Sequence, residues 1–230
     1  LPVRDGFISE LYAPNDSNEI QEDERCFYTK ENAGKIDAMM DYVHTKVPKK
    51  LKPYCLGPLL VKCSIHTNTS GVFKGFHKGG WGGKKGNALD RIKGTIHLEC
   101  PIWHETPKNV IVERRDVLDF LDTLPEVDLI YLDPPYNQHP YGSNYFMLNL
   151  IATNKKPEQI SKVSGIPENW NRSKYDYKRQ IKDTMTRTLE LSTRKAKYTL
   201  VSYSNEGFIS PTEWEEILKP YTYERIDIDY

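Results

Sequence analysis

The stretch DLIYLDPPY, residues 128–136, decides the fold and the candidate site of this chain. The apolar run from Asp128 to Leu132 predicts a buried parallel strand. Each of the two following prolines lacks a backbone N–H and has a fixed φ, so the chain must leave the sheet directly after Asp133. A carboxylate, two rigid carbonyl groups and the ring of Tyr136 therefore lie at the carboxyl end of a strand, where ligands bind in open α/β sheets. Such a group suits a planar base that carries an exocyclic amine.

Alternating strands and helices are predicted on both sides of this stretch, which indicates an α/β fold. Strand 109–113, helix 116–124 and strand 128–132 have the order of a right-handed parallel crossover. Residues 66–94 show no periodicity and contain many glycines, so we expect a long loop there. The other predicted elements are helices 29–47, 54–65, 143–152, 177–194 and 210–218 and strands 196–203 and 223–230.

The composition limits the classes of protein to which the chain can belong. Its 230 residues are 38% hydrophobic, with a mean hydropathy of −0.66, which fits one large soluble domain or a domain with an insert. The sequence contains no long apolar run and no signal peptide, so we expect a cytoplasmic protein with reduced cysteines. Since 32 basic residues balance 32 acidic ones, any binding to nucleic acid must depend on local patches.

One such patch is predicted in the glycine-rich loop. Its basic residues are interleaved with aromatic ones, a pattern that favours contact with nucleic acid over a merely solvated surface, which stays the alternative. The residues concerned are Lys74, Lys78, Lys84 and Lys85, interleaved with Phe73, Phe76, His77 and Trp81.

Two Cys/His pairs resemble zinc ligands by their spacing. Cys63-x-x-His66 and His97-x-x-Cys100 could supply four ligands if they met in space. Both pairs lie in apolar surroundings, and we predict no metal site.

Four motifs occur in an order that resembles a known family. They are NAGKID at residues 32–37, NTSGVFKG at 68–75, LDPPYN at 132–137 with Tyr141 and Asn144-Tyr145 behind it, and SYSNEG at 202–207. Together they resemble the Dam-type, or D12 class, of DNA adenine-N6 methyltransferases. The resemblance implies a Rossmann-like methyltransferase sheet with a helical and loop insert, S-adenosylmethionine as cofactor and double-stranded DNA as substrate. It also implies sequence-specific methylation of the restriction-modification kind, with a cognate restriction endonuclease as an expected partner.

The chemistry of an exocyclic amine gives roles to the residues of the central motif. Asp133 can accept one hydrogen bond from the adenine amine, and a carbonyl group of the Pro134-Pro135 turn can accept a second. Tyr136 would stack on a base flipped out of the duplex. The resemblance implies that Asp116 contacts the adenine or ribose of the cofactor, whereas its position equally predicts a helix N-cap.

Polar and aromatic side chains elsewhere are expected to contact DNA. Turn formation is the alternative for the first three of them, and ordinary helix packing is the alternative for the last. These residues are Asn68, Thr69, Ser70, Asn137, Tyr141, Asn144 and Tyr145.

The chain departs from the family pattern in one respect. The family has a Phe-x-Gly-x-Gly turn after its first strand that holds the methionine end of the cofactor, and no such turn precedes Asp133. We therefore expect a sheet that is incomplete at its N-terminus, with a preceding segment of the same enzyme missing from this chain. The expected organisation is an acidic connecting segment at 1–28, a DNA-contacting helical and loop segment at 29–105, and a catalytic α/β half at 106–230.

Three other functions stay open at this stage. Cytosine-N4 methylation uses the same geometry, although that family more often has Ser in place of Asp133. Guanine methyltransferases of ribosomal RNA share the central motif but are compact and lack an insert like residues 66–94. A non-catalytic DNA-binding fragment or subunit is favoured by the missing glycine-rich turn.

Overall fold

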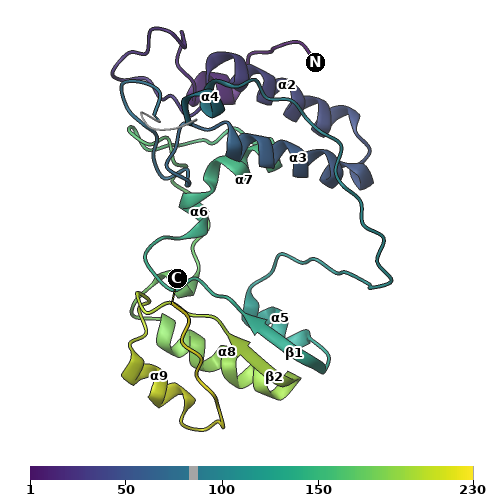
Figure 1. Ribbon diagram of the computed structural model, residues 1–230, viewed down its shortest axis with the longest axis vertical. Coiled ribbons are helices and arrows are strands. Elements are labelled where there is room, and N and C mark those ends of the chain that lie inside the picture. Colours follow the sequence, from purple (N-terminus) through teal and green to yellow (C-terminus); the bar gives the residue numbers. More distant parts are fainter. Residues whose placement is uncertain (83–87, 230) are drawn as a thin grey trace. The chain divides into compact units, whose positions relative to one another are not determined.

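The structure is a computed structural model that describes residues 1–82 and 88–229, and it divides into two compact units. Unit 1 comprises Leu1–Glu105 and Tyr141–Asn171, and unit 2 comprises Thr106–Pro140 and Arg172–Tyr230 (Figure 1). This division differs from the predicted boundaries, because residues 141–171 belong with the N-terminal part of the chain. No helix in the described part is long and apolar enough to cross a membrane.

Unit 1 is built from helices. The Thr29 side chain accepts a hydrogen bond from the backbone N–H of Asn32, which begins the predicted helix 29–47 as expected for an N-cap. The predicted helix 143–152 is interrupted at Tyr145, and a short helix that was not predicted lies within the predicted loop 66–94. The helices are α1 (Phe7–Leu11), α2 (Lys30–Lys46), η1 (Lys49–Leu51), α3 (Lys52–Ile65), α4 (Ala88–Lys93), α6 (Tyr141–Asn144) and α7 (Phe146–Thr153).

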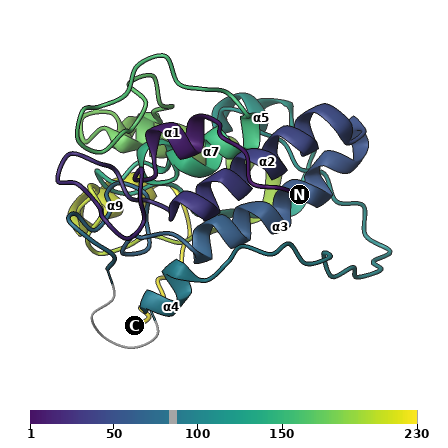
Figure 2. The same cartoon turned by 90° about the horizontal axis from the view of Figure 1, so that it is seen from above.

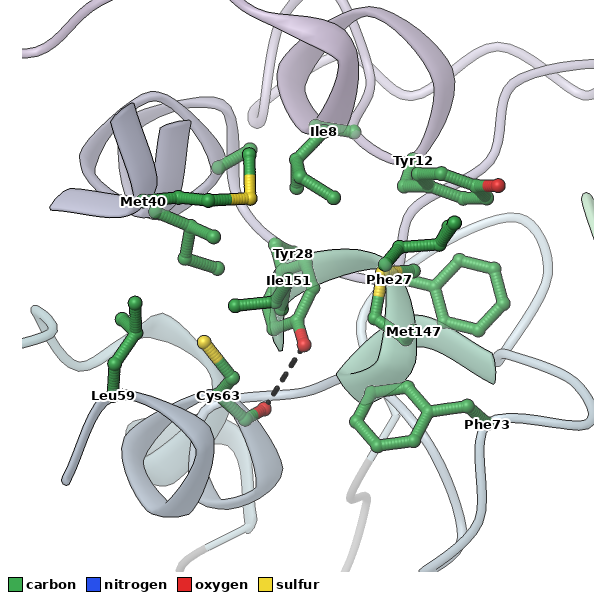
Figure 3. Close-up of a cluster of buried hydrophobic side chains, with 14 of the residues drawn as sticks. Ile8, Tyr12, Phe27, Tyr28, Met40, Leu59, Cys63, Phe73, Met147 and Ile151 are labelled. Carbon is green, nitrogen blue, oxygen red and sulfur yellow. Dashed lines mark hydrogen bonds between the residues drawn. The ribbon is translucent and has the colours of Figure 1, made fainter. Parts of the chain in front are cut away.

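The core of unit 1 includes the N-terminal residues that were predicted to form a connecting segment. Ile8, Tyr12 and Phe27 are fully buried and pack with side chains of α2, α3 and α7 (Figure 3). The hydroxyl of Tyr28, also fully buried, donates to the carbonyl oxygen of Cys63 at 3.1 Å, and burial raises the pKa of this phenol. In this core, α1 packs against α2, and α2 packs against α3 (Figure 2). Residues 7–28 are therefore an integral part of unit 1.

Unit 2 contains two of the predicted strands, at residues 127–132 and 196–201, and the structure pairs them with each other. Strand β1 pairs in parallel with β2, with Val127 opposite Ala196 and Leu132 opposite Val201. The elements of the unit are α5 (Val117–Thr123), β1 (Val127–Leu132), η2 (Lys174–Asp176), α8 (Ile181–Lys195), β2 (Ala196–Val201) and α9 (Pro211–Leu218). Helix α8 begins four residues later than predicted, because Tyr177 to Gln180 form a turn before it. The sequence Ser210-Pro211-Thr212-Glu213 predicts a capping box, and Ser210 and Glu213 form one at the start of α9.

One face of the β1–β2 pair is covered and the other is open. Ile130 and Leu132 are buried in a cluster with side chains of α5, α8 and α9. On the opposite face, four large side chains, in two pairs across the strands, are between 53 and 63% exposed. They are Leu129, Tyr131, Tyr198 and Leu200. We call these four residues the open sheet face.

Two predicted strands are wrong. Residues 109–113 and 223–229 form no strand in the structure, and Val110, Ile111 and Val112 are between 70 and 89% exposed. A strand is stable only when a neighbour satisfies its N–H and C=O groups, and among the described residues β1 and β2 pair only with each other. The predicted crossover therefore lacks its first strand. The apolar residues of both segments are typical of strands. A sequence pattern, however, does not show whether a neighbouring strand is present to pair with.

Candidate active site at the carboxyl ends of β1 and β2

The motif at residues 133–136 lies at the carboxyl end of β1, as predicted. Strand β1 ends at Leu132, and the carbonyl oxygen of this residue accepts a hydrogen bond from Ser202 N at 2.9 Å. The next residue, Asp133, is exposed, whereas Pro134 and Pro135 are half-buried. Because β2 runs parallel to β1, the segment that follows β2 lies at the same edge of the sheet. Two loops therefore form this edge, residues 133–140 and residues 202–210.

Tyr136 is held against the loop that follows β2. Its ring centroid lies 5.8 Å from that of Tyr203, with an interplanar angle of 63°. Its carbonyl oxygen accepts a hydrogen bond from Phe208 N at 2.8 Å. The Tyr203 ring in turn packs edge-on against Trp214 of α9, at 5.0 Å between centroids. Three aromatic rings thus form a continuous row from the motif to α9.

The exposed carboxylate of Asp133 and the row of three aromatic rings indicate which kind of ligand this edge of the sheet could bind. Asp133 presents an acceptor-only group to solvent, and Tyr136 presents an aromatic face close by in sequence. A planar heterocycle with an N–H group can be held by such a pair, since the ring stacks and the N–H donates.

Asp116 is the N-cap of α5. Its Oδ1 accepts a hydrogen bond from Leu118 N at 2.9 Å, and its side chain is exposed. Asp116 was expected to follow strand 109–113, but the residues before it form no strand. The capping role was the alternative, and it is confirmed.

Asn68 is buried, which corrects its predicted role in contacting DNA. The side chain has no exposed surface, and its amide nitrogen donates to the carbonyl oxygens of Cys26 at 2.9 Å and Gly80 at 3.1 Å. Its amide oxygen accepts from Gly82 N at 2.7 Å. Asn68 therefore fixes the path of residues 77–82 and has no surface to offer a base or a phosphate.

The other predicted residues of the glycine-rich loop divide into a buried and an exposed set. Thr69 is buried, and Phe73 and Phe76 pack on Phe27 in the core of unit 1. Two of the four aromatic residues predicted to be interleaved with the basic ones, Phe73 and Phe76, are thus part of the core. Ser70, Lys74 and Lys78 are exposed. Lys84 and Lys85 lie outside the described residues.

The residues predicted just past the central motif belong to different units. Asn137 is in unit 2, where its Oδ1 accepts from His139 N at 3.0 Å in a tight turn. Tyr141 and Tyr145 are in unit 1, with their rings stacked at 5.6 Å between centroids. The carbonyl oxygen of Asn144 accepts from Phe73 N at 2.7 Å. The structure therefore brings helix α6 next to the glycine-rich loop.

Replacing Asn68 by alanine is expected to destabilise unit 1 by about 2 kcal/mol, because buried partners at Cys26, Gly80 and Gly82 lose their hydrogen bonds. Asn68→Asp should be at least as damaging, since a carboxylate would face carbonyl oxygens. Urea unfolding measures the change, with Asn149→Ala, an exposed site on α7, as the matched control. An unfolding free energy for Asn68→Ala equal to that of the control would contradict the structural role.

Three residues of this edge were not predicted as site residues. Tyr203, Trp214 and Gly207 all lie in or beside the loop that follows β2. Tyr203 carried a usable signal, because it was the last residue of a predicted buried strand and lies in the SYSNEG motif at 202–207. Gly207 is the last residue of the SYSNEG motif at 202–207, whereas Trp214 carried no signal, since its importance depends on its contact with Tyr203.

The two Cys/His pairs do not form a metal centre in the described part of the chain. No group of three or more potential ligands among the described residues could hold a metal ion. The ring nitrogen Nδ1 of His66 instead lies 2.7 Å from the carbonyl oxygen of Arg91, and Cys100 is exposed while Cys63 is buried.

Comparison with known proteins identifies relatives of this chain. The chain is 28% identical over 220 residues to the type II methyltransferase M.CviAII of Paramecium bursaria Chlorella virus 1, covering 94% of this chain and 60% of that protein. It is 29% identical over 238 residues to the type II methyltransferase M.NlaIII of Neisseria lactamica, covering 100% of this chain and 65% of that protein. The type II methyltransferase M.FokI of Planomicrobium okeanokoites is 29% identical over 222 residues, covering 90% of this chain and 32% of that protein.

The chain thus spans between 32 and 65% of the length of these relatives. No solved structure gives a significant match. A family model matches residues 16–217, which include the β1 motif, Tyr203 and most of α9. The chain belongs to the D12 class of N6 adenine-specific DNA methyltransferases.

Proposed function

We propose that the protein containing this chain transfers a methyl group from S-adenosylmethionine to the N6 amine of adenine in specific DNA sequences. The observation that carries the proposal is the Asp133-Pro-Pro-Tyr136 motif at the carboxyl end of β1, in a chain that belongs to this family. The printed names of the relatives, type II methyltransferases and modification methylases, support a role in restriction-modification. A cognate restriction endonuclease is part of the proposal.

Asp133 acts by positioning the amine. Adenine N6 is a poor nucleophile because its lone pair is delocalised into the ring. Two fixed acceptors, the Asp133 carboxylate and a carbonyl oxygen of the Pro134-Pro135 turn, favour a more pyramidal nitrogen whose lone pair points at the methyl donor. The proton leaves after attack, when the amine is cationic, so no strongly basic group is needed.

Tyr136 receives the target base. The amine of adenine is buried in a duplex, and the base must be flipped out before Asp133 can reach it. Tyr136 is only half-buried and its ring contacts Tyr203, and an aromatic ring at the edge beside Asp133 supports a stacking role.

The cofactor contacts available in this chain are few. S-adenosylmethionine supplies the electrophilic methyl group when bound. The exposed Asp116 carboxylate uses one oxygen to cap α5, and its other oxygen fits a hydroxyl donor such as ribose. We propose that the Gly-rich turn and the rest of a Rossmann-like sheet come from a segment of the same protein outside these 230 residues. The open sheet face supports this, because such a segment would bury its apolar side chains.

The alternatives are distinguished by the product. The full-length protein containing this chain is incubated with tritiated S-adenosylmethionine and, in separate reactions, with duplex DNA or ribosomal RNA, and each nucleic acid is digested to nucleosides. Label in N6-methyladenine is expected. Label in N4-methylcytosine would contradict the adenine assignment, and transfer to ribosomal RNA in preference to DNA would support the RNA methyltransferase reading. No transfer to either, with DNA binding retained, would support a non-catalytic subunit.

Removing the positive charges of Lys74 and Lys78 should weaken DNA binding and reduce its salt dependence. Each phosphate contact contributes about 0.9 to the slope of log K against log salt, so the double alanine variant should lower the slope by about two. DNA affinity measured between low and moderate salt tests this. Lys49→Ala with Lys50→Ala, two exposed lysines of η1, is the matched control. An unchanged slope would favour the alternative, in which the lysines of this loop form a solvated surface that does not contact DNA.

A further inference from the structure

We propose that Tyr203 is a positioning residue that holds the Tyr136 ring in the orientation needed to stack on the target base. The inference rests on the proposed function, and it adds a residue from a second loop to the base-binding side of the site. Tyr203 lies two residues past the end of β2 and Tyr136 lies four residues past the end of β1, so the parallel pairing of the two strands brings them to one edge.

The contact between the two rings is of a kind that fixes orientation. At 5.8 Å between centroids and 63° between planes, the pair is close to the edge-to-face arrangement that aromatic rings prefer. The hydrogen bond from Phe208 N to the carbonyl oxygen of Tyr136 restrains the backbone of the same residue. Backbone and ring of Tyr136 are therefore both held by residues 203–208.

Tyr203 can hold its neighbour because it is itself held on three sides. Its hydroxyl oxygen accepts a hydrogen bond from Ile209 N at 3.1 Å. Its ring packs edge-on against Trp214, whose helix α9 is fixed at its start by the Ser210 cap. Its third neighbour is Gly207, where a Cβ atom would overlap the Tyr203 ring.

The position of the Tyr203 ring requires a residue without a side chain at position 207. The φ of this residue lies outside the left-handed region, so backbone conformation does not demand a glycine here. The lack of space beside the Tyr203 ring is the reason for the small residue. An added methyl group would displace the ring without deleting any functional group, and this displacement should be transmitted to Tyr136.

A double-mutant cycle separates positioning from a general loss of structure. Tyr203→Ala should slow single-turnover methyl transfer by about three- to tenfold, because Tyr136 must then lose its rotational freedom when the base arrives. In a Tyr136→Ala background the same change should have almost no effect. An equal loss in both backgrounds would overturn the proposal.

The fluorescence of 2-aminopurine at the target position reports stacking directly. Tyr203→Ala should reduce its quenching on binding, whereas Tyr203→Phe, which keeps the ring, should restore both quenching and rate to within about twofold of the wild type. Damage from Tyr203→Phe equal to that from Tyr203→Ala would assign the role to the hydroxyl and overturn the proposal.

Gly207→Ala provides the second variant. It should lower the quenching and the rate as Tyr203→Ala does, with cofactor affinity unchanged. Gly57→Ala on α3, where a Cβ meets nothing within 4 Å, is the matched control. Thermal unfolding of each variant shows that it is folded. Wild-type quenching in Gly207→Ala would contradict the inference.

Failure of the proposed function would look different from failure of this inference. If the proposed function were wrong, the wild-type protein would produce no N6-methyladenine. If only the inference were wrong, the wild-type protein would be active, and the effects of Tyr203→Ala and Tyr136→Ala on the rate would be additive.

Discussion

Replacing Asp133 by alanine is expected to lower the rate of methyl transfer by about a thousandfold, because the reacting amine loses a preorganised acceptor. The carboxylate is exposed at the end of β1 and contributes nothing to the buried cluster of unit 2, so the fold should be retained. Affinity for the cofactor should change far less than the rate. Single-turnover transfer of tritium to DNA, together with calorimetric titration of the cofactor, measures the two effects separately.

Strand β1 supplies the control for this experiment. Asp128 is also exposed and lies near the opposite end of the same strand. Asp128→Ala should leave the rate within about twofold of the wild type, because changes at exposed sites away from such features are small. Asp133→Asn retains one acceptor oxygen and should fall between the wild type and the alanine variant. A rate for Asp133→Ala above a tenth of the wild type would remove Asp133 from the mechanism.

Tyr136→Ala is expected to weaken capture of the flipped base by about ten- to a hundredfold, the range that base stacking on an aromatic side chain contributes. Tyr136→Phe should be mild, because the stacking face matters more than the hydroxyl. Fluorescence of 2-aminopurine at the target position measures both variants. Tyr223→Ala, at an exposed tyrosine of unit 2, is the control. If phenylalanine proved as damaging as alanine, the hydroxyl would be the functional group.

The elements that the sequence predicted correctly are those with local signals. The apolar run before Asp133, the helical spacing over residues 29–47 and the capping box at Ser210 all depend on residues close together in the chain. The predicted strands 109–113 and 223–229 failed because a strand also needs a partner, and no local pattern states whether one is present.

The same distinction explains the outcome at the site. The position of Asp133 and Tyr136 followed from two prolines after a strand, which is a local signal. The burial of Asn68 depends on Cys26 and Gly80, and the packing of Tyr203 depends on a strand pair formed across most of unit 2. A polar motif such as residues 68–70 suggests contact with a ligand and a structural role equally well until its partners are known.

Both units are discontinuous in sequence, and this affects the order in which the protein folds as it is synthesised. Unit 1 has all its residues only when Asn171 has been made, and by then β1 of unit 2 is already complete. Its partner β2 does not begin until Ala196. Pairing of distant strands is slow, and unpaired apolar strands are prone to aggregate. We therefore expect residues 127–132 to depend longest on protection by chaperones while the ribosome completes the chain.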